Sequence, residues 1–231
     1  MRVTAAILAL SSMRRSEGIG WHSRLGSREV LETVVENMQN SRIVDDMAIV
    51  TDDETLLSRG SYSGVDIRAC PDNMRAYTFN FLGIETYRIC MERDFLDAVG
   101  LKGNVSLFAA WTMPLVSSRT IERLYHVLLE DPLAGRAVPI VKVDPQIYMR
   151  CQGQDTFFPV WVHKGMDRQR IPQLYRCRTF CVAHMDRLTR SLPKIAGLQV
   201  PKAELTTISK PDDLELATFL MERNGQGPVD V

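Results

Sequence analysis

The sequence lacks an excess of charge of either sign and a long apolar run. Its 231 residues carry 28 Lys and Arg against 28 Asp and Glu, so the formal net charge is zero. General binders of nucleic acid or of anionic membranes need an excess of positive charge, and both classes are therefore disfavoured. No stretch approaches the roughly 20 apolar residues of a membrane-spanning helix. We expect no partnership with nucleic acid or membrane.

Cysteine is scarce and unpaired in pattern. The five residues are odd in number and spread over the chain: Cys70, Cys90, Cys151, Cys177 and Cys181. Cys177 and Cys181 are four residues apart, but no second pair of ligands accompanies them, so no zinc site is predicted. No Ser/His/Asp or Cys/His pattern of nucleophilic catalysis emerges from the scattered histidines. The composition indicates reduced cysteines in a cytoplasmic protein.

The length of the chain, together with the absence of repeats and low-complexity segments, predicts one domain over residues 1–231. The apolar run 3–10 contains Thr4 and is followed by Arg14 and Arg15 with no convincing cleavage site. We interpret it as a first core strand and not as a signal peptide. Hydrophobic periodicity predicts strands at 3–10, 47–50, 65–68, 105–110, 137–143 and 180–183, and helices at 27–38, 74–99, 117–130 and 214–224. This alternation indicates an α/β sheet with helices on both faces.

The first strand, helix and second strand form a predicted βαβ unit with a small and basic loop, 11–20, after the first strand. Nucleotides bind beyond the carboxyl ends of strands in such sheets. Ser11 and Ser12 offer hydroxyls and backbone N–H groups to phosphate, or they form an ordinary turn. Four arginines offer planar donor forks for a phosphate clamp, or a solvated face: Arg14, Arg15, Arg24 and Arg28. Arg15 carries most of this hypothesis.

Acidic residues follow the second predicted strand. Asp52, Asp53 and Glu54 either bind a metal, as in glycosyltransferases of similar topology, or begin a helix, which the pattern favours. Thr112 is a candidate for a hydrogen bond to a base or ribose, and its alternative is a turn hydroxyl. Trp21 and Trp111 stack on a nucleobase in one interpretation and pack in the core in the other.

Several segments of the chain follow one another in a recognisable order. The segment 108–115 parallels the motif L-L-Q-P-T-S-P-L, 168–175 parallels R-Q-x-x-P-x-x-Y, and 207–214 parallels D-I-D-x-x-x-D-L. Before them, 51–54 matches a T-D-x-E-like turn, and the first loop contains Arg15, Gly18 and Gly26 in register with a loop motif. In the order of these motifs the chain resembles the cytidylyltransferases that activate acidic sugars, the acylneuraminate and ketodeoxyoctonate CMP-sugar synthetases.

The resemblance implies a three-layer nucleotidyltransferase fold (nucleotide-diphospho-sugar transferase-like) with a mixed, mainly parallel sheet. It also implies CTP and an acidic sugar as substrates, Mg²⁺ as cofactor and a homodimer. An excursion near 144–172 is expected to form the dimer interface. Arg168 and Gln169 are expected to bind the acceptor carboxylate. Arg14, Arg15, Ser11, Ser12 and Thr112 are expected to bind the nucleotide.

Four positions depart from the family pattern where its chemistry lies. Leu10 and Ile19 stand in place of the loop Arg and Lys, and Thr207 and Ser209 in place of the acidic pair that holds Mg²⁺. A hydroxyl is a poor ligand for a hard divalent cation, and losing one charge-stabilising group commonly costs about 10²–10³ in rate. Two hypotheses follow: a divergent cytidylyltransferase, or a non-catalytic homologue that binds a nucleotide, an activated sugar or a partner enzyme. A glycosyltransferase that uses the 52–54 cluster is a third.

Overall fold

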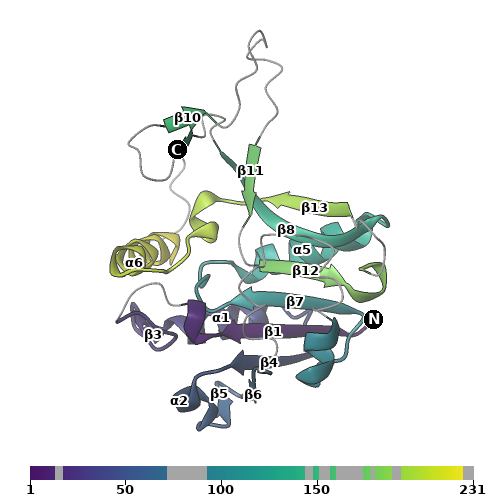
Figure 1. Ribbon diagram of the computed structural model, residues 1–231, viewed down its shortest axis with the longest axis horizontal. Helices are drawn as coiled ribbons and strands as arrows, with labels where there is room; N and C mark the ends of the chain where they lie inside the picture. The colour runs from purple at the N-terminus through teal and green to yellow at the C-terminus, as the bar shows by residue number, and fades with distance from the viewer. Residues whose placement is uncertain are drawn as a thin grey trace.

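A mixed β-sheet flanked by helices forms the body of the protein (Figure 1). The computed structural model describes residues 1–13, 18–71, 93–143, 148–150, 157–159, 174–177, 180–188 and 194–225. The strands are β1 Val3–Ala9, β2 Arg24–Leu25, β3 Arg28–Glu29, β4 Asp46–Thr51, β5 Ser61–Tyr62, β6 Val65–Ala69, β7 Val105–Ala110, β8 Ala134–Val143, β9 Tyr148–Arg150, β10 Phe157–Pro159, β11 Leu174–Cys177, β12 Phe180–His184 and β13 Lys194–Gln199. The helices are η1 Ser11–Met13, α1 Val30–Asn40, α2 Glu54–Leu57, α5 Ser118–Glu130, η4 Met185–Arg187, η5 Lys202–Leu205 and α6 Pro211–Gly225.

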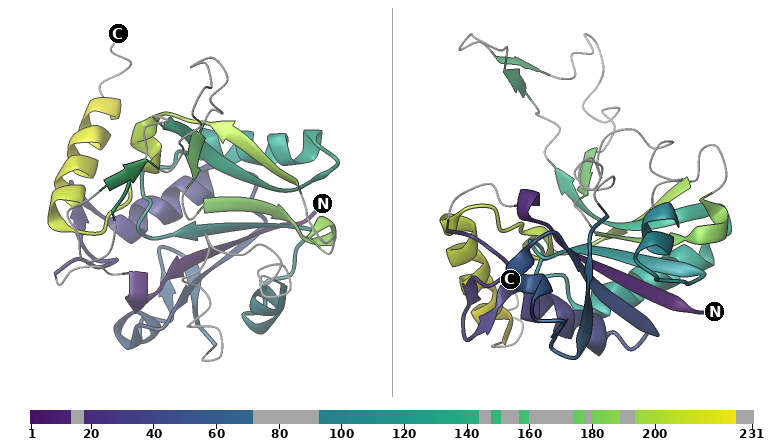
Figure 2. Two further views of the ribbon diagram at one scale, coloured as in Figure 1. Left: turned by 45° about the horizontal axis from the view of Figure 1, so that its top comes forward. Right: turned by 60° about the horizontal axis from the view of Figure 1, so that its bottom comes forward.

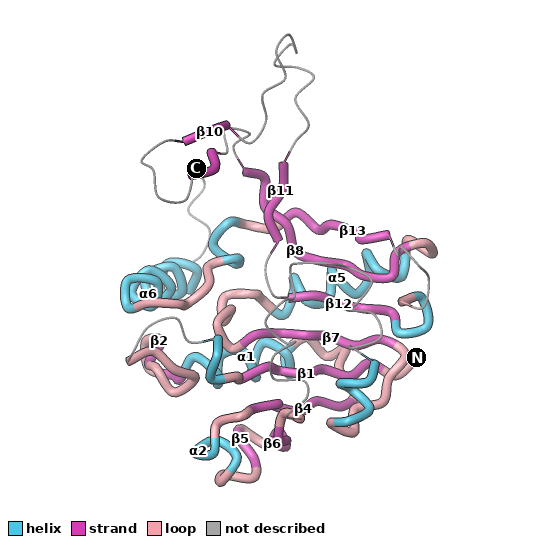
Figure 3. The backbone as a smooth tube through the Cα atoms, viewed as in Figure 1, coloured by secondary structure: helices cyan, strands magenta, loops and turns pink. Residues whose placement is uncertain are grey.

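The centre of the sheet is parallel. Within the described residues the strands follow the order β11-β8-β12-β7-β1-β4-β6-β5, and β13 pairs with β8. β1 lies parallel to both β4 and β7, with Ile7 opposite Ile49 on one side and Ala109 on the other. β12 runs antiparallel to β7 and β8. Figure 3 shows β12, β7, β1 and β4 as magenta tubes that lie side by side.

Every residue of β1 is buried, because the strand is covered on both faces. Val3, Ala5, Ile7 and Ala9 point into a core that includes α1 and α5. Alternate residues of β1 point into a second core with the helical segment 93–98 on the opposite face. This period of two, buried on both sides, is typical of central parallel strands. The predicted three-layer α/β fold with a mixed sheet is confirmed.

The start of α1 differs from the expectation. The helix begins at Val30 and not at residue 27, because Arg28–Glu29 pair with Arg24–Leu25 as a short hairpin. Glu29 then caps the helix in a reciprocal arrangement with Glu32. Gly26 turns the hairpin with φ +64°, and a Cβ there would meet Met221 of α6 at 3.2 Å. Figure 2 shows α6 beside this N-terminal segment.

The other predicted elements are present with shifted boundaries. Either Ser117 or Ser118 is expected to cap the helix predicted at 117–130, and α5 begins at Ser118 with Ser117 as its N-cap, while β8 begins three residues earlier than the periodicity indicated. The predicted helix 74–99 falls largely outside the described residues, as does most of the predicted excursion 144–172. In the part of the chain that the structure describes, no helix has the length and hydrophobicity of a bilayer crossing.

Candidate functional site

Four parallel strands end side by side, and the loops that follow them form the candidate site. β1 ends at Ala9, β4 at Thr51, β6 at Ala69 and β7 at Ala110. Figure 1 shows η1 at this edge of the sheet and α6 on the same side, opposite the N-terminus. Ligands of open α/β sheets bind beyond the carboxyl ends of the strands. The carboxyl edge is therefore the place to look for chemistry.

Ser11, two residues past the end of β1, is held by Asp52, the first residue past the end of β4. The backbone N–H of Ser11 donates to Oδ1 of Asp52 at 2.7 Å, and its hydroxyl donates to Oδ2 at 2.6 Å. Ser11 is exposed and Asp52 is half-buried. Both donors that the sequence assigned to a phosphate group thus already bind an internal carboxylate.

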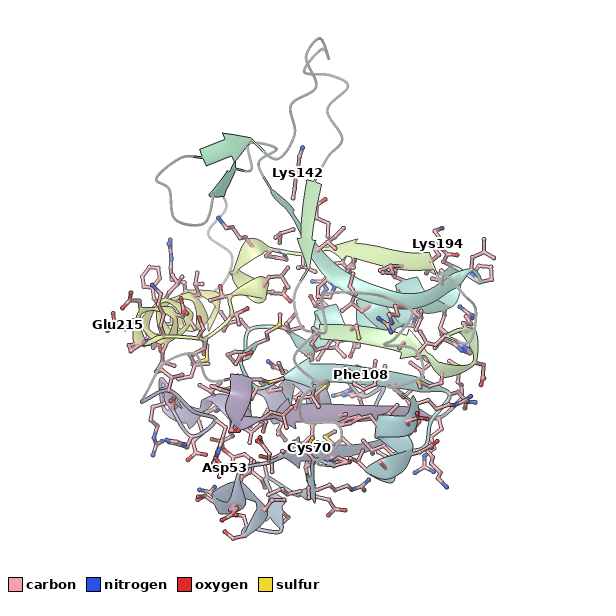
Figure 4. The ribbon with its side chains drawn as sticks, in the orientation of Figure 1. Asp53, Cys70, Phe108, Lys142, Lys194 and Glu215 are labelled. Carbon is pink, nitrogen blue, oxygen red and sulfur yellow. The ribbon has the colours of Figure 1, made fainter. Side chains whose placement is uncertain are left out.

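Asp53 is the N-cap of α2, which confirms the helix-start interpretation of this residue. Its carboxylate accepts from the backbone N–H groups of Thr55 and Leu56, and it also accepts from Nε1 of Trp21 at 3.2 Å. Figure 4 labels Asp53 near the end of β4. Among the described residues there is no group of three or more His, Cys, Asp or Glu side chains arranged to hold a metal ion.

Both tryptophans that are candidates for stacking, Trp21 and Trp111, lie in the core. Trp21 is 3% exposed and Trp111 is 1% exposed, so neither offers a free face to a base. The guanidinium of Arg59 lies 4.6 Å from the ring centroid of Trp21 and also covers Tyr62. Burial and a hydrogen bond to Glu29 raise the pKa of Tyr62. This cluster fixes the segment that leads into the β2–β3 hairpin.

Backbone hydrogen bonds hold the loop beyond β7. Ile208 donates its N–H to the carbonyl of Thr112 at 2.8 Å, and Trp111 donates its N–H to the carbonyl of Leu8 at 3.0 Å. The side-chain amide of Asn37 in α1 donates to the carbonyl of Pro114. Because Ile208 is fully buried, the segment 207–209 lies fixed against the end of β7.

The side-chain hydroxyls of Thr207 and Ser209 in this segment differ in their hydrogen bonding. Oγ1 of Thr207 is buried and has no hydrogen-bond partner in the described part of the structure. The hydroxyl and backbone N–H of Ser209 both donate to Oδ2 of Asp213, at 2.7 and 3.0 Å. Burial raises the pKa of Asp213, but the hydrogen bonds from Ser209 and Lys210 outweigh it and leave that pKa below its ordinary value.

Two other departures from the resembled pattern belong to the core. Leu10 is 1% exposed and packs among the side chains of the second core, such as Leu8 and Phe108. Ile19 is 6% exposed and packs in the first core. A charged side chain at either position would have to be desolvated. The apolar residues are therefore built into the fold at the entrance and exit of the loop.

The donors at the expected magnesium position do not fit Mg²⁺. That ion prefers several oxygen ligands including carboxylates in octahedral geometry. Thr207 offers a buried neutral hydroxyl, and the hydroxyl of Ser209 already donates to Asp213. We therefore derive no chemical step through a metal at this position.

The structure brings some of the predicted site residues together. Ser11 and Thr112 follow neighbouring strands, and Thr112 is buried with its carbonyl bound to Ile208. Ser12 lies in η1, whereas Arg14, Arg15, Arg168 and Gln169 lie outside the described residues. Two other candidate arginines are in the β2–β3 hairpin: Arg24 donates to the carbonyl of Ser27, and Arg28 pairs with Glu36.

The sequence pattern does not reveal the contact that Asp52 makes with Ser11. The pattern predicts a metal ligand or a helix start for Asp52 and its neighbours, whereas in the structure Asp52 binds Ser11 across 41 residues of sequence. A signal did exist: Ser11 and Asp52 each follow the end of a predicted strand. Strand pairing places Ala9 opposite Thr51, which brings the two following loops together.

The comparisons with known proteins agree with this fold. No protein-family profile and no curated protein matches the sequence. Solved structures do match: a CMP:2-keto-3-deoxy-manno-octonic acid synthetase in complex with CTP is similar with a TM-score of 0.65 and 12% identity, over 97% of this chain and 100% of that one.

A second kind of synthase has the same architecture. The 4-diphosphocytidyl-2C-methyl-D-erythritol synthase from Anaerococcus prevotii matches with a TM-score of 0.63 and 14% identity, over 96% of this chain and 99% of that one. Another solved structure of a 4-diphosphocytidyl-2C-methyl-D-erythritol synthase matches with a TM-score of 0.64 and 16% identity, over 96% of this chain and 99% of that one. The chain thus has the fold of these cytidylyltransferases, as the motif order predicted.

Proposed function

We propose that the protein is a cytidylyltransferase-like enzyme that binds CTP at the carboxyl edge of the sheet and transfers CMP to an acidic sugar or a related acceptor. In this reaction an oxygen of the acceptor bonds to the α-phosphorus of CTP, and the bond to the departing pyrophosphate breaks. The observation that carries the proposal is the docking of segment 207–209 on β7 through the hydrogen bond from Ile208 to Thr112. The full-length similarity to solved cytidylyltransferases supports it.

Each predicted residue has a role in this proposal. Ser11 and Ser12 cradle the triphosphate, and Arg14 and Arg15 neutralise its charge, because Arg offers a planar fork of donors to phosphate. Thr112, at the end of β7, contacts the nucleoside. Arg168 and Gln169 bind the acceptor carboxylate, and the homodimer brings them to the site.

A second candidate is a non-catalytic homologue that binds a nucleotide, an activated sugar or a partner enzyme. Specific observations favour it: Leu10 and Ile19 are buried in the core, and the hydroxyl of Ser209 is bound to Asp213. Removal of one charge-stabilising group commonly costs about 10²–10³ in rate. A site that has lost several such groups retains its binding contacts more easily than its catalytic power.

Nucleotide-dependent thermal unfolding separates these candidates. CTP, ATP, GTP and UTP are each added with and without Mg²⁺, and CTP is expected to give the largest rise in Tm. A ligand at 100 times its Kd stabilises the folded state by about 2.7 kcal/mol. For a chain of this length that corresponds to a rise of about 5–10 °C.

Pyrophosphate release from CTP in the presence of a panel of acidic sugars then tests for transfer. Release with one acceptor supports the enzyme, whereas a CTP shift without release favours the non-catalytic homologue. No shift with any nucleotide would contradict CTP binding. The variant Arg15→Gln is expected to weaken CTP binding, and Arg123→Gln, at an exposed position of α5, serves as the matched control.

A further inference from the structure

The backbone N–H and the hydroxyl of the exposed residue Ser11 both donate to one carboxylate, that of Asp52. We propose that Asp52 is a gate on Ser11: its carboxylate occupies the position that a phosphate group of the ligand takes, and the ligand binds by displacing it. This inference rests on the proposed function, which assigns Ser11 to the triphosphate. It adds Asp52 as a positioning residue that sets the affinity of the site for anions.

The geometry of the pair is that of a bound anion. One oxygen of Asp52 accepts the backbone N–H of Ser11 at 2.7 Å, and the other accepts the hydroxyl at 2.6 Å. Short bonds of this kind are typical of a charged acceptor. Two oxygens of a phosphate group present the same pair of acceptors with the same sign of charge. The carboxylate and the phosphate therefore compete for the same two donors.

The helix beyond β4 does not depend on Asp52. The N-cap of α2 is Asp53, which accepts from Thr55 and Leu56. The carboxylate of Asp52 can therefore leave Ser11 while the start of α2 keeps its hydrogen bonds. Its half-buried position gives it access to solvent, which lowers the cost of releasing a charged group.

Ser209 makes the same kind of contact with a carboxylate as Ser11 does, but that contact has a different structural role. Asp213 accepts both the hydroxyl and the N–H of Ser209, but it also accepts the N–H of Lys210 at the start of α6. Displacing Asp213 would remove hydrogen bonds that begin this helix. Asp213 is thus a helix-start residue, and it provides a matched comparison for Asp52.

The experiment measures the Kd of inorganic pyrophosphate and of CTP by calorimetry. Asp52→Asn is expected to tighten pyrophosphate binding about tenfold, because the competing charged acceptor is lost and such bonds contribute more than neutral ones. Glu54→Gln removes the same charge from the exposed neighbour and is expected to change the Kd by at most about threefold. Asp213→Asn is expected to leave the pyrophosphate Kd within the same limit.

A double variant tests whether the gain passes through Ser11. Adding Ser11→Ala to Asp52→Asn is expected to weaken pyrophosphate binding about fivefold relative to Asp52→Asn alone, since one donor is lost and the backbone N–H remains. Equal effects of Asp52→Asn and Glu54→Gln would overturn the gate, because charge alone would then explain the gain. So would a gain that is insensitive to Ser11→Ala.

Failure of the gate is distinguishable from failure of the proposed function. If wild type binds CTP and Asp52→Asn does not tighten it, the gate is wrong and CTP binding stands. If Asp52→Asn gains pyrophosphate binding through Ser11 but no variant prefers CTP to other nucleotides, the gate stands and the cytidylyltransferase proposal fails. No binding of either probe to any variant overturns both.

Discussion

The two sides of the carboxyl edge are held together in different ways. Beyond β1 and β4 the contact is made by side chains, above all the carboxylate of Asp52 on Ser11. Beyond β7 it is made by the backbone, with Ile208 bound to Thr112 and buried completely. The first side can change by rotation of one exposed or half-buried side chain, whereas the second can change only if the packed core opens.

This difference separates binding from stability. The side beyond β7, held by Ile208 and Thr112, is the fixed wall of the edge and preserves its geometry. The side of Ser11 and Asp52 is the adjustable wall, because it can exchange an internal contact for a ligand. The two together suit a ligand-binding edge. Substitutions beyond β7 are therefore expected to lower the free energy of unfolding. Substitutions at the Ser11–Asp52 pair are expected to change the affinity for pyrophosphate and CTP.

Truncation of Ile208 should cost the most. Ile208→Ala is expected to lower the free energy of unfolding by about 2–5 kcal/mol, since it leaves a cavity at a fully buried position, and urea titration measures this. The control Ile208→Val is expected to cost about 0.5–1.5 kcal/mol. If Ile208→Ala unfolded with the wild-type midpoint, the side beyond β7 would not be the fixed wall.

Restoring carboxylates beyond β7 should create a dependence on Mg²⁺. Thr207→Asp with Ser209→Asp is expected to lower stability by about 2 kcal/mol without metal, because a carboxylate replaces a buried hydroxyl. Millimolar Mg²⁺ is expected to recover part of that loss, as read from Tm, and wild type is the control. CTP consumption that appears only in the variant with Mg²⁺ would identify the protein as a decayed synthetase. An identical response of wild type and variant to Mg²⁺ would show that these positions do not form a metal site.

Loss of the α2 cap should affect stability on the adjustable side. Asp53→Ala is expected to cost about 1–2 kcal/mol, because the backbone N–H groups of Thr55 and Leu56 and the indole N–H of Trp21 lose their acceptor. Chemical denaturation monitored by tryptophan fluorescence measures the loss. Asp52→Ala serves as the control and is expected to cost less, since Asp52 does not cap α2. A larger loss at Asp52 would reverse the roles assigned to the two residues.

The contact between Asp213 and Ser209 should make the stability of the protein depend on pH in the acid range. The pKa of Asp213 is lower in the folded protein than its ordinary value. A depressed folded-state pKa contributes stability above the unfolded-state pKa, and this is lost as the pH falls through the folded value. The stability difference between wild type and Asp213→Asn is therefore expected to be present at neutral pH and to shrink below about pH 4. A difference that stayed constant from pH 7 to pH 3 would contradict this linkage.

The fold was predictable because its signals are local. The apolar runs of β1 and β7 are buried on both faces, and such strands read as continuous hydrophobic segments. The capping chemistry of Ser117 or Ser118 predicts a helix start here, and Ser117 is the N-cap of α5. In contrast, β2 and β3 have two residues each, too few for a period, so the predicted helix 27–38 includes β3.

The site was only partly predictable because its contacts are long-range. The sequence singled out Ser11 and flagged Leu10 and Ile19 as departures, but it does not reveal that both apolar residues are core positions. The contact between Ser11 and Asp52 depends on the register of β1 with β4. The bond from Ser209 to Asp213, in contrast, spans only four residues and belongs to the local start of α6.

The smallest effect is expected at Arg59, on the adjustable side. Its guanidinium carbon lies 4.6 Å from the ring centroid of Trp21 and 5.6 Å from that of Tyr62. An exposed cation–π contact contributes about 0.5–1 kcal/mol, so Arg59→Gln should lower the unfolding free energy by that amount, as measured by urea titration. Arg123→Gln, at an exposed position of α5, is the control. If Arg59→Gln lowered the free energy of unfolding as much as Ile208→Ala, the segment around Trp21 would be held as rigidly as the loop beyond β7. Side-chain contacts would then not make this side of the site the adjustable one.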